Sequence, residues 1–323
     1  MFPFQNNSTE VDSWSQAVFL APLLCGIFAL IGLAGWVYCV EKKWHGKATI
    51  PLELLRNHVF TATILNTACL GFPYLLSVYS FPIWFQVVNK KSALDAGLML
   101  LPMLGATAVG STVGGAINGK ANRLFETMVV ACLLMIVGCA LETTAPASVE
   151  VQGKVLGFLV LIGLGFGLSA SASTMLANLE SPIHEHASAQ GIVAQIRIWG
   201  GSIGIAASSA ILSVKSEAHF GADAEGLVNP EMLVLQQDSL TEEQWQAIRR
   251  MYTAALKQDM IVCCGVTALA LIFTLGIYRR NRVSIQDQQR NKVMEERQRV
   301  LAAKAQDRTT KAGLESVATK AQV

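Results

Sequence analysis

Charged residues are scarce in this chain. Only 15% of its 323 residues are charged, 52% are hydrophobic, and the mean hydropathy is +0.42. That balance excludes an ordinary soluble domain and indicates an integral membrane protein. The chain also lacks any C-x-x-C pair, and its seven cysteines all fall within apolar runs. We therefore expect neither a disulfide framework nor a zinc site, and interpret the cysteines as small buried hydrophobic residues.

Motifs of soluble enzymes are missing as well. His184 and His186 are two residues apart, a spacing that suits neither a metal site on one helix face nor a nucleophile–base pair. The sequence therefore predicts no enzyme, no metal or other cofactor, and no nucleic-acid partner.

The chain does contain seven apolar runs, each close to the 20 or so residues that a helix needs to cross a bilayer. These runs lie near residues 17–40, 60–84, 94–118, 127–146, 155–177, 190–213 and 258–278. The sequence predicts an all-α integral membrane protein with about seven transmembrane helices, in a transmembrane domain over 17–278.

Lysine and arginine are distributed unevenly between the two sides of these spans. One alternating set of connections, together with the tail 279–323, holds 17 of the 25 cations; the other set holds 7, and Arg197 lies inside a span. Because cytoplasmic connections are enriched in lysine and arginine, we predict a cytoplasmic basic tail and an extracellular segment 1–16. Asn7 begins an N-x-S/T glycosylation pattern, which agrees with an outside position for that segment.

The longest outer connection is predicted to be a loop over 215–257. Within it, Thr241-Glu-Glu-Gln244 has the form of a capping box. Apolar residues recur after it at helical spacing: Trp245, Ile248, Tyr252 and Ala255. We expect a short helix that lies on the outer membrane surface.

A hairpin between the second and third apolar runs has a distinctive sequence. Tyr79-Ser-Phe-Pro-Ile-Trp-Phe-Gln86 ends one run, and Ser92-Ala-Leu-Asp-Ala-Gly97 leads to Leu100-Leu-Pro102 in the next. Prolines such as Pro82 and Pro102 free backbone carbonyls that neighbouring helices or water must satisfy. The stretch resembles the "Y-x-x-P-x-x-F-Q … S-A-x-x-A-G-x-x-x-L-P" hairpin of fungal major-facilitator transporters of the 14-span drug:proton antiporter group.

Three other stretches extend this resemblance to about residues 14–280. Residues 41–58 resemble the "W … E … P-L-x-L-L/F-R" connection of the family, with Trp14 before the first span. Residues 110–123 resemble a cytoplasmic loop that ends in Gly-Arg, with Lys-Ala-Asn-Arg in its place. The stretch from Ile196 to Ala206 resembles "F-R-x-L-G-G-x-x-G-x-A", with Ile196 for the aromatic residue and Trp199 for leucine.

The resemblance implies a linker helix followed by the six-helix C-terminal half of a major-facilitator fold. It implies proton-coupled efflux of drugs, toxins or secondary metabolites by alternating access, with the proton gradient as the energy source. The expected partners are the lipid bilayer, protons and a small amphipathic molecule. We expect the plasma membrane, with the vacuolar membrane as the alternative. Because the antiporter signature of the family lies in its N-terminal half, we expect this chain to need a missing N-terminal half or a homodimer partner.

The resemblance also implies that the second, third, fifth and sixth spans line a central cavity. The candidate cavity residues are Asn66, Tyr74, Met103, Thr107 and Arg197. The amide of Asn66 fits a hydrogen bond to another helix equally well. Arg197 fits either a functional position inside the span or a side chain that extends to the headgroups at the cytoplasmic end.

Small residues at short helical spacing mark narrow helix faces. The pairs are Gly110 and Gly114, Gly163 and Gly167, and Gly201 and Gly204. Such faces let neighbouring backbones approach closely. The first pair, before the loop that contains Lys120 and Arg123, also fits a conformational latch.

Three carboxylates lie in or near the predicted spans, and two other classes of membrane protein are alternatives to a transporter. Asp95 and Glu142 lie near span ends and Asp259 begins the last span, so we predict that none of these carboxylates is deeply placed, and the sequence leaves open which acid carries the proton. A seven-span receptor would fit the topology, but its acidic-Arg-aromatic triplet, its Asn-Pro-x-x-Tyr motif and its loop cysteines are all lacking. A non-transporting membrane fragment is the other alternative.

Overall fold

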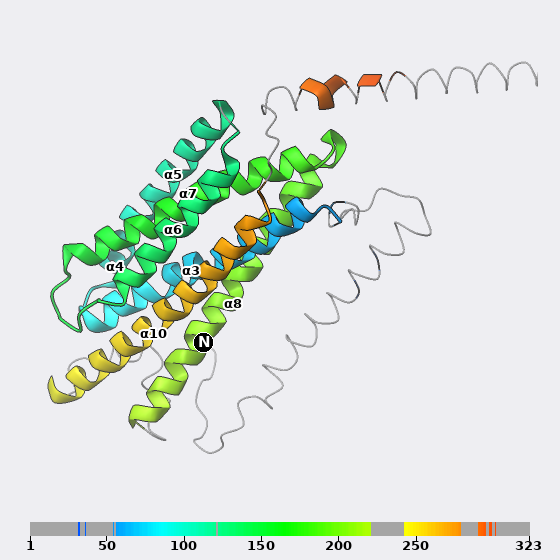
Figure 1. The fold of residues 1–323 in the computed structure, drawn as a ribbon. Coiled ribbons are helices and arrows are strands. Elements are labelled where there is room, and N and C mark those ends of the chain that lie inside the picture. The colour runs from blue at the N-terminus through cyan, green and yellow to red at the C-terminus, as the bar shows by residue number, and fades with distance from the viewer. Residues whose placement is uncertain are drawn as a thin grey trace, which may run out of the picture. The chain divides into compact units, whose positions relative to one another are not determined.

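The computed structural model describes residues 32, 36, 54, 56–120, 122–220, 242–278, 290–294, 297–298 and 301. The chain divides into two units, Met1–Leu52 and Glu53–Val323. Only two residues of the first unit are described, so the predicted extracellular segment with Asn7 and the predicted span 17–40 lie outside the described residues. The described helices belong to the second unit apart from residues 32 and 36 (Figure 1).

All elements of the described residues are helices (Figure 1). They are α3 (His58–Val88), α4 (Ala93–Met99), α5 (Leu101–Lys120), α6 (Leu124–Glu142), α7 (Gly153–Glu180), the 3₁₀ helix η1 (Ile183–Glu185), α8 (His186–Phe220) and α10 (Glu242–Leu275). Within the described residues, six helical segments are long and apolar enough to cross a membrane, with α4 and α5 forming one of them. The prediction of an all-α membrane protein is confirmed.

Local sequence explains where these helices start and break. The side chain of Asn57 accepts a hydrogen bond from the backbone nitrogen of Val59 at 3.1 Å and so caps the first turn of α3. Ser92 caps α4 in the same way. Pro102 is the second residue of α5, a position where proline is tolerated, and the helix breaks just before it at Leu100. Pro82, by contrast, lies inside α3.

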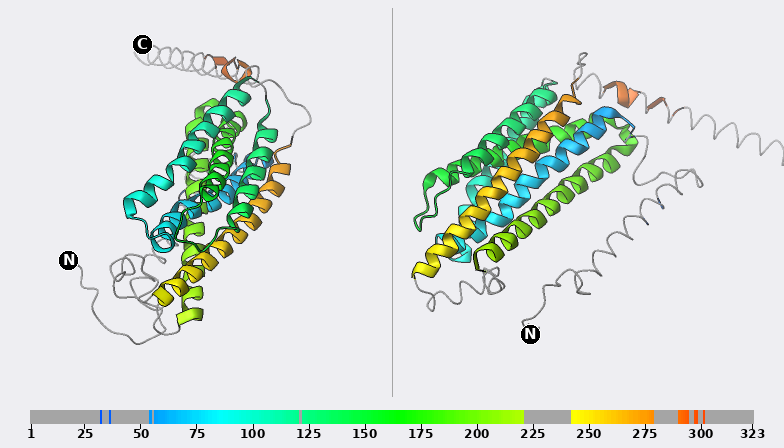
Figure 2. Two further views of the ribbon diagram at one scale, coloured as in Figure 1. Left: turned by 90° about the vertical axis from the view of Figure 1, so that its left-hand side faces the viewer. Right: turned by 60° about the horizontal axis from the view of Figure 1, so that its bottom comes forward.

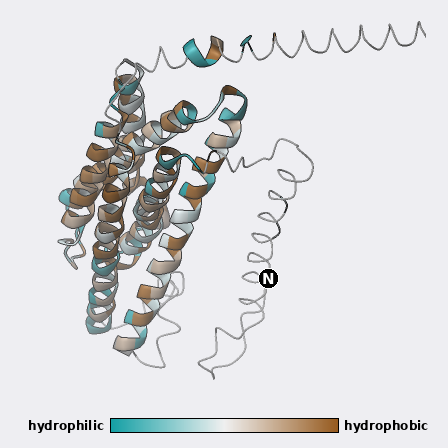
Figure 3. Ribbon diagram, turned by 45° about the vertical axis from the view of Figure 1, so that its right-hand side comes forward, coloured by the Kyte–Doolittle hydropathy of each residue, from teal (hydrophilic) through white to brown (hydrophobic). Residues whose placement is uncertain are grey.

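Helix α3 lies at the centre of the bundle. It packs against α7, α8 and α10, whereas α5 packs mainly against α7, and α6 packs against α7 and α10 (Figure 2). The large side chains of Phe60, Phe81 and Phe85 on α3 are completely buried. Hydrophobic residues run along the helices of the bundle (Figure 3), and several of them are exposed, such as Leu133 on α6 and Ile272 on α10, which are 47% and 61% exposed. An apolar exterior of this kind suits contact with lipid.

Glycines set the closest helix contacts. A methyl group added at Gly163 would meet the Met103 carbonyl, and one added at Gly167 would meet the Thr107 carbonyl and lie 2.8 Å from the Ser111 nitrogen. The backbones of α5 and α7 therefore approach at a distance that no side chain allows. Gly110 and Gly114 line the same contact from α5, where added methyl groups would meet Leu164 and Ser171 of α7. Gly201 and Gly204 let α8 approach α3 closely in the same way, because methyl groups added there would meet Leu75 and Phe72 of α3.

The expected short surface helix is wrong. Residues 242–257 are helical, but they form the first part of α10 and continue without a break into the apolar segment. Their apolar face is buried against protein rather than spread on a membrane surface: Trp245 is 2% exposed and Tyr252 3%. Trp84 on α3 donates its indole N–H to Thr253 Oγ1 at 3.2 Å, which ties this part of α10 to the bundle.

Three short stretches of the basic tail are described, residues 290–294, 297–298 and 301, and the first of them contacts the bundle. Lys292, in residues 290–294, donates hydrogen bonds to the carbonyl oxygens of Asn178, Leu179 and Ser181 at 3.0, 2.6 and 2.6 Å. These carbonyls lie at the end of α7, where a helix leaves acceptors without partners and a cation is favourable. The rest of the tail lies mostly outside the described residues.

Candidate functional site

Four side chains from three helices meet in the middle of the bundle. Tyr74 on α3 stacks on Phe166 of α7 with ring centroids 3.6 Å apart and planes within 4°. The guanidinium of Arg197 on α8 lies over the Phe166 ring, and its Cζ is 5.7 Å from the ring centroid. Its Nη2 donates to Ser173 Oγ on α7 at 2.8 Å. We call Tyr74, Phe166, Ser173 and Arg197 the aromatic–arginine cluster.

The charge of Arg197 is not balanced by a carboxylate among the described residues. The ion pairs there lie at helix ends, such as Lys90 with Glu242 and Arg249 with Glu242. Arg197 is instead held by one hydroxyl and one aromatic face. A cation in a spanning helix is costly and normally faces the bundle interior, a water-filled space or a partner. The Arg197 guanidinium reaches across to α7, so the cluster offers a positive charge beside flat apolar surface.

The structure brings together two of the five predicted cavity residues, Tyr74 and Arg197. Asn66 is fully buried and donates to the Ala270 carbonyl and to Thr274 Oγ1, both at 2.8 Å on α10. Its amide thus links two helices. Met103 is fully buried and Thr107 donates to the Met103 carbonyl at 2.9 Å, in the part of α5 that lies against α7.

Two members of the cluster were not foreseen from the sequence. Phe166 and Ser173 lie in the Gly- and Ser-rich run 163–173 of the fifth apolar segment, whose spacing favours helix packing over a direct substrate contact. Phe166 is the single aromatic residue within that run, which indicates that its ring packs in one defined position between helices. Its neighbours Gly165 and Gly167 do pack closely, against α6 and α5.

The prediction that no carboxylate is deeply placed is wrong. Asp259 is 2% exposed and lies well inside α10, because the helix begins at Glu242 and not at the apolar segment. Glu142, the last residue of α6, is fully buried, and neither of its carboxylate oxygens has a hydrogen-bond partner among the described residues. Groups that can carry a proton are thus present inside the bundle.

Comparison with known proteins identifies similar chains. The family model described as Major Facilitator Superfamily matches residues 10–205. An MFS-type transporter of Claviceps purpurea (strain 20.1) is 26% identical over 271 residues, which cover 82% of this chain and 46% of that protein. The efflux pump hmp6 of Hypomyces subiculosus is 23% identical, over 78% of this chain and 45% of that protein. The efflux pump roqT of Penicillium rubens is 24% identical, over 81% and 50%.

A solved structure is similar in fold. It is the crystal structure of a bacterial homologue of the human lysosomal transporter Spinster, in an inward-facing and unoccupied conformation. The TM-score is 0.56 at 16% identity, over 71% of this chain and 50% of that one. The chain spans about half the length of the curated relatives that it matches.

Proposed function

Because the chain belongs to the Major Facilitator Superfamily, we propose that it forms one six-helix half of a proton-coupled exporter of amphipathic aromatic compounds. Membership of this family places the chain among transporter proteins and not among enzymes, and makes it a multi-pass membrane protein, as its sequence predicts. The resemblance to fungal transporters of this family is likewise confirmed. Membership of the 14-span subgroup stays a prediction.

The aromatic–arginine cluster is the observation that carries the proposed substrate class. Tyr74, which stacks on Phe166, provides a flat aromatic surface, and Arg197 provides five N–H donors, of which one is used within the described residues, by Ser173. An aromatic compound with an acidic or carbonyl oxygen would satisfy both features, by stacking and by a charge-assisted hydrogen bond. Two of the relatives carry names of efflux pumps, which supports export as the direction of transport.

The transport cycle is proposed to need a second six-helix half. In this class of transporter the substrate site lies between two repeats that rock against each other. The described residues contribute six helical segments of spanning length, and the cluster belongs to these alone. A partner half, on whichever polypeptide it is carried or from a second copy of this chain, would close the other side of the site. A chain that moves no substrate with any partner would instead be a non-transporting fragment.

We place the protein in the plasma membrane, where export removes a compound from the cell, with the vacuolar membrane as the alternative. The proton gradient is the proposed energy source, and no cofactor is invoked.

The experiment is reconstitution of the purified chain into vesicles with an imposed proton gradient. The chain is tested alone and together with a six-span amino-terminal half supplied as a second polypeptide, using anionic and cationic fluorescent aromatic dyes. We expect gradient-dependent movement of the anionic dye only when both halves are present. Movement by a demonstrated monomer of the chain would overturn the need for a second half, and no movement in either preparation would overturn the proposed function.

A pair of matched variants tests the cluster itself. Arg197→Gln removes the charge but keeps hydrogen-bonding capacity, and it should lower transport of the anionic dye at least tenfold. Lys154→Gln removes a cation from the exposed start of α7 and should leave transport unchanged. An equal loss in both variants, or a loss for the cationic dye as large as that for the anionic one, would contradict a direct contact between Arg197 and the substrate.

A further inference from the structure

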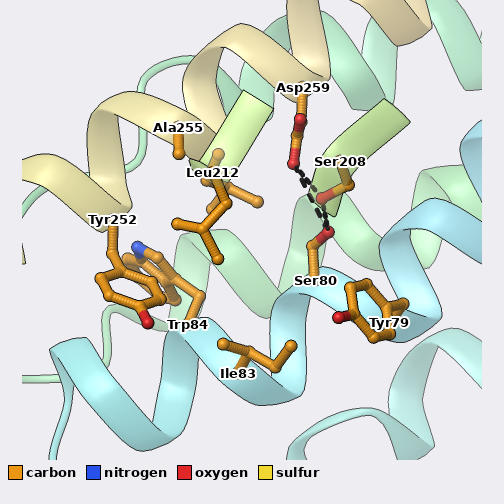
Figure 4. Close-up of a pocket in the computed structure, with 10 residues that line it drawn as sticks. Tyr79, Ser80, Ile83, Trp84, Ser208, Leu212, Tyr252, Ala255 and Asp259 are labelled. Carbon is orange, nitrogen blue, oxygen red and sulfur yellow. Dashed lines mark hydrogen bonds between the residues drawn. The ribbon is translucent and has the colours of Figure 1, made fainter. Parts of the chain in front are cut away.

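A second polar site lies apart from the aromatic–arginine cluster, on α3, α8 and α10. Ser208 on α8 donates to Asp259 Oδ2 on α10 at 2.6 Å, and Ser80 on α3 is 2.8 Å from Ser208 Oγ and 3.5 Å from the same carboxylate oxygen (Figure 4). All three residues are buried, with exposed fractions of 2% for Asp259, 5% for Ser208 and 7% for Ser80. We call these three residues the Asp–Ser triad.

The hydrogen bonds assign a direction to each hydroxyl. A serine has one O–H to donate, and Ser208 donates it to the carboxylate in the shortest bond of the group. Ser80 is therefore left to donate to Ser208 or to Asp259. The other carboxylate oxygen, Asp259 Oδ1, is buried and has no partner among the described residues. One oxygen of the acid is thus held in place while the other is open to a proton.

A small cavity adjoins the triad. Its volume is about 30 Å³, and its walls include all three members of the triad with Tyr79, Trp84 and Tyr252 (Figure 4). A cavity needs roughly 10–15 Å³ to admit one water molecule, and a stable water needs two or more polar partners. The triad supplies those partners. The cavity therefore has room and hydrogen-bonding groups for about one or two waters, which is what proton delivery to a buried acid requires.

The described residues that line the cavity include no charged group besides Asp259 that would fix its protonation state. Among the described residues that line the cavity, α3 contributes the Tyr79 phenol, α8 contributes only Ser208 and Leu212, and α10 contributes the Tyr252 phenol. The Cys263 thiol lies one turn further along α10. No lysine, arginine or second carboxylate lines the cavity within the described part of the chain. A carboxylate buried in a spanning helix without a cation is costly and marks a functional site by default.

From this geometry we propose that Asp259 is the proton carrier of this six-helix half. The inference rests on the proposed proton-coupled export. One proton from the aqueous phase binds Asp259 Oδ1 and converts the carboxylate to the neutral acid, while Oδ2 keeps its bond from Ser208. The same proton leaves to the other aqueous phase after the halves rock. Because the triad joins α3, α8 and α10, a change in the charge of Asp259 acts directly on the contact between these helices.

The first test reads the proton without transport. The purified chain, with ¹³C-labelled aspartate, is placed in lipid nanodiscs and its infrared carboxyl bands are followed from acidic to alkaline pH. We expect one titrating aspartate band from a buried acid that is absent in Asp259→Asn and retained in Asp95→Asn, whose carboxyl is exposed. A band that survives in Asp259→Asn would overturn the proposal. A band that responds to sodium concentration at constant pH would also overturn it, because the triad would then be a sodium site.

The second test separates coupling from a structural role. In vesicles that contain both halves, Asp259→Asn should still let dye equalise across the membrane down its gradient, but should accumulate dye against the gradient at least tenfold less. Ser208→Ala, which leaves the acid in place, should keep accumulation and alter the pH at which it is half-maximal. Equal loss of downhill and uphill movement in Asp259→Asn would make the residue structural and overturn the proposal. If wild-type vesicles move no dye at all, the proposed export fails, while the infrared result still decides whether Asp259 binds a proton.

Discussion

The close contact between α5 and α7 predicts a large effect from a single methyl group. In Gly167→Ala the new Cβ would lie 3.0 Å from the Thr107 carbonyl carbon and 2.8 Å from the Ser111 nitrogen, both backbone atoms that cannot turn away. Non-bonded carbon atoms prefer about 3.5–4.0 Å. The two helices must therefore separate by about 0.5 Å or more at this point, and Ser111 Oγ, which donates to the Gly167 carbonyl at 3.2 Å, moves with them.

The cost follows from the packing along the contact. Forcing extra methyl groups into a well-packed core costs about 1–3 kcal/mol. Gly157, on the same helix, provides the control because a methyl group there would meet nothing within 4 Å. Gly157→Ala should stabilise the protein by up to about 1 kcal/mol through helix propensity. We therefore expect the two variants to differ by about 1–4 kcal/mol in free energy of unfolding.

The assay is reversible unfolding of both variants and the wild type in the same detergent or nanodisc, followed by the signal of the tryptophans and by far-ultraviolet circular dichroism. Gly167→Ala should unfold first and Gly157→Ala last. Equal stability of the two variants would refute the argument, because it would show that α5 and α7 do not approach as closely as the backbone positions require.

Two further predictions concern Asn66 and the orientation. Asn66→Leu removes two hydrogen bonds between α3 and α10, each worth roughly 0.6 kcal/mol. It should therefore lower the free energy of unfolding by about 1 kcal/mol in the same assay. A loss of transport with unchanged stability would instead indicate that Asn66 contacts the substrate. The excess of cations on one side predicts that a tag at Gly221 is accessible from outside intact cells and that a tag at the C-terminus is protected, and the reverse pattern would contradict the orientation.

Some features were readable from the sequence because they depend on local composition. A bilayer of fixed thickness demands about 20 apolar residues for each span, and the six predicted spans within the described residues each fall on a helix of the structure. The break between α4 and α5 also has a local cause, Pro102, although the predicted span 94–118 ran through it. The glycine pairs predicted narrow faces without revealing which helix each face meets. That Gly163 and Gly167 face α5, whereas Gly201 and Gly204 face α3, is a property of the assembled bundle.

The start of α10 shows where local reasoning failed although the signal was present. The capping box at 241–244 and the apolar spacing after it indicated a helix, and no proline or glycine separates that helix from the apolar segment. Charged residues such as Lys257 and Asp259 suggested a membrane boundary at this point. Helix continuity depends on the backbone and not on that boundary, so α10 extends through both parts.

The amino-acid sequence by itself determined the class of the molecule: how many apolar segments it has, that they are helical, and to which family they belong. Only the tertiary structure decided the sites. Ser80, Ser208 and Asp259 are separated by up to 179 residues, and Arg197 reaches a ring on another helix. Hydrophobic length fixes a span because the bilayer acts on each segment separately. A meeting of side chains depends on the rotation of every helix about its axis, and that rotation is set jointly by the small-residue contacts and buried aromatic side chains of the whole bundle.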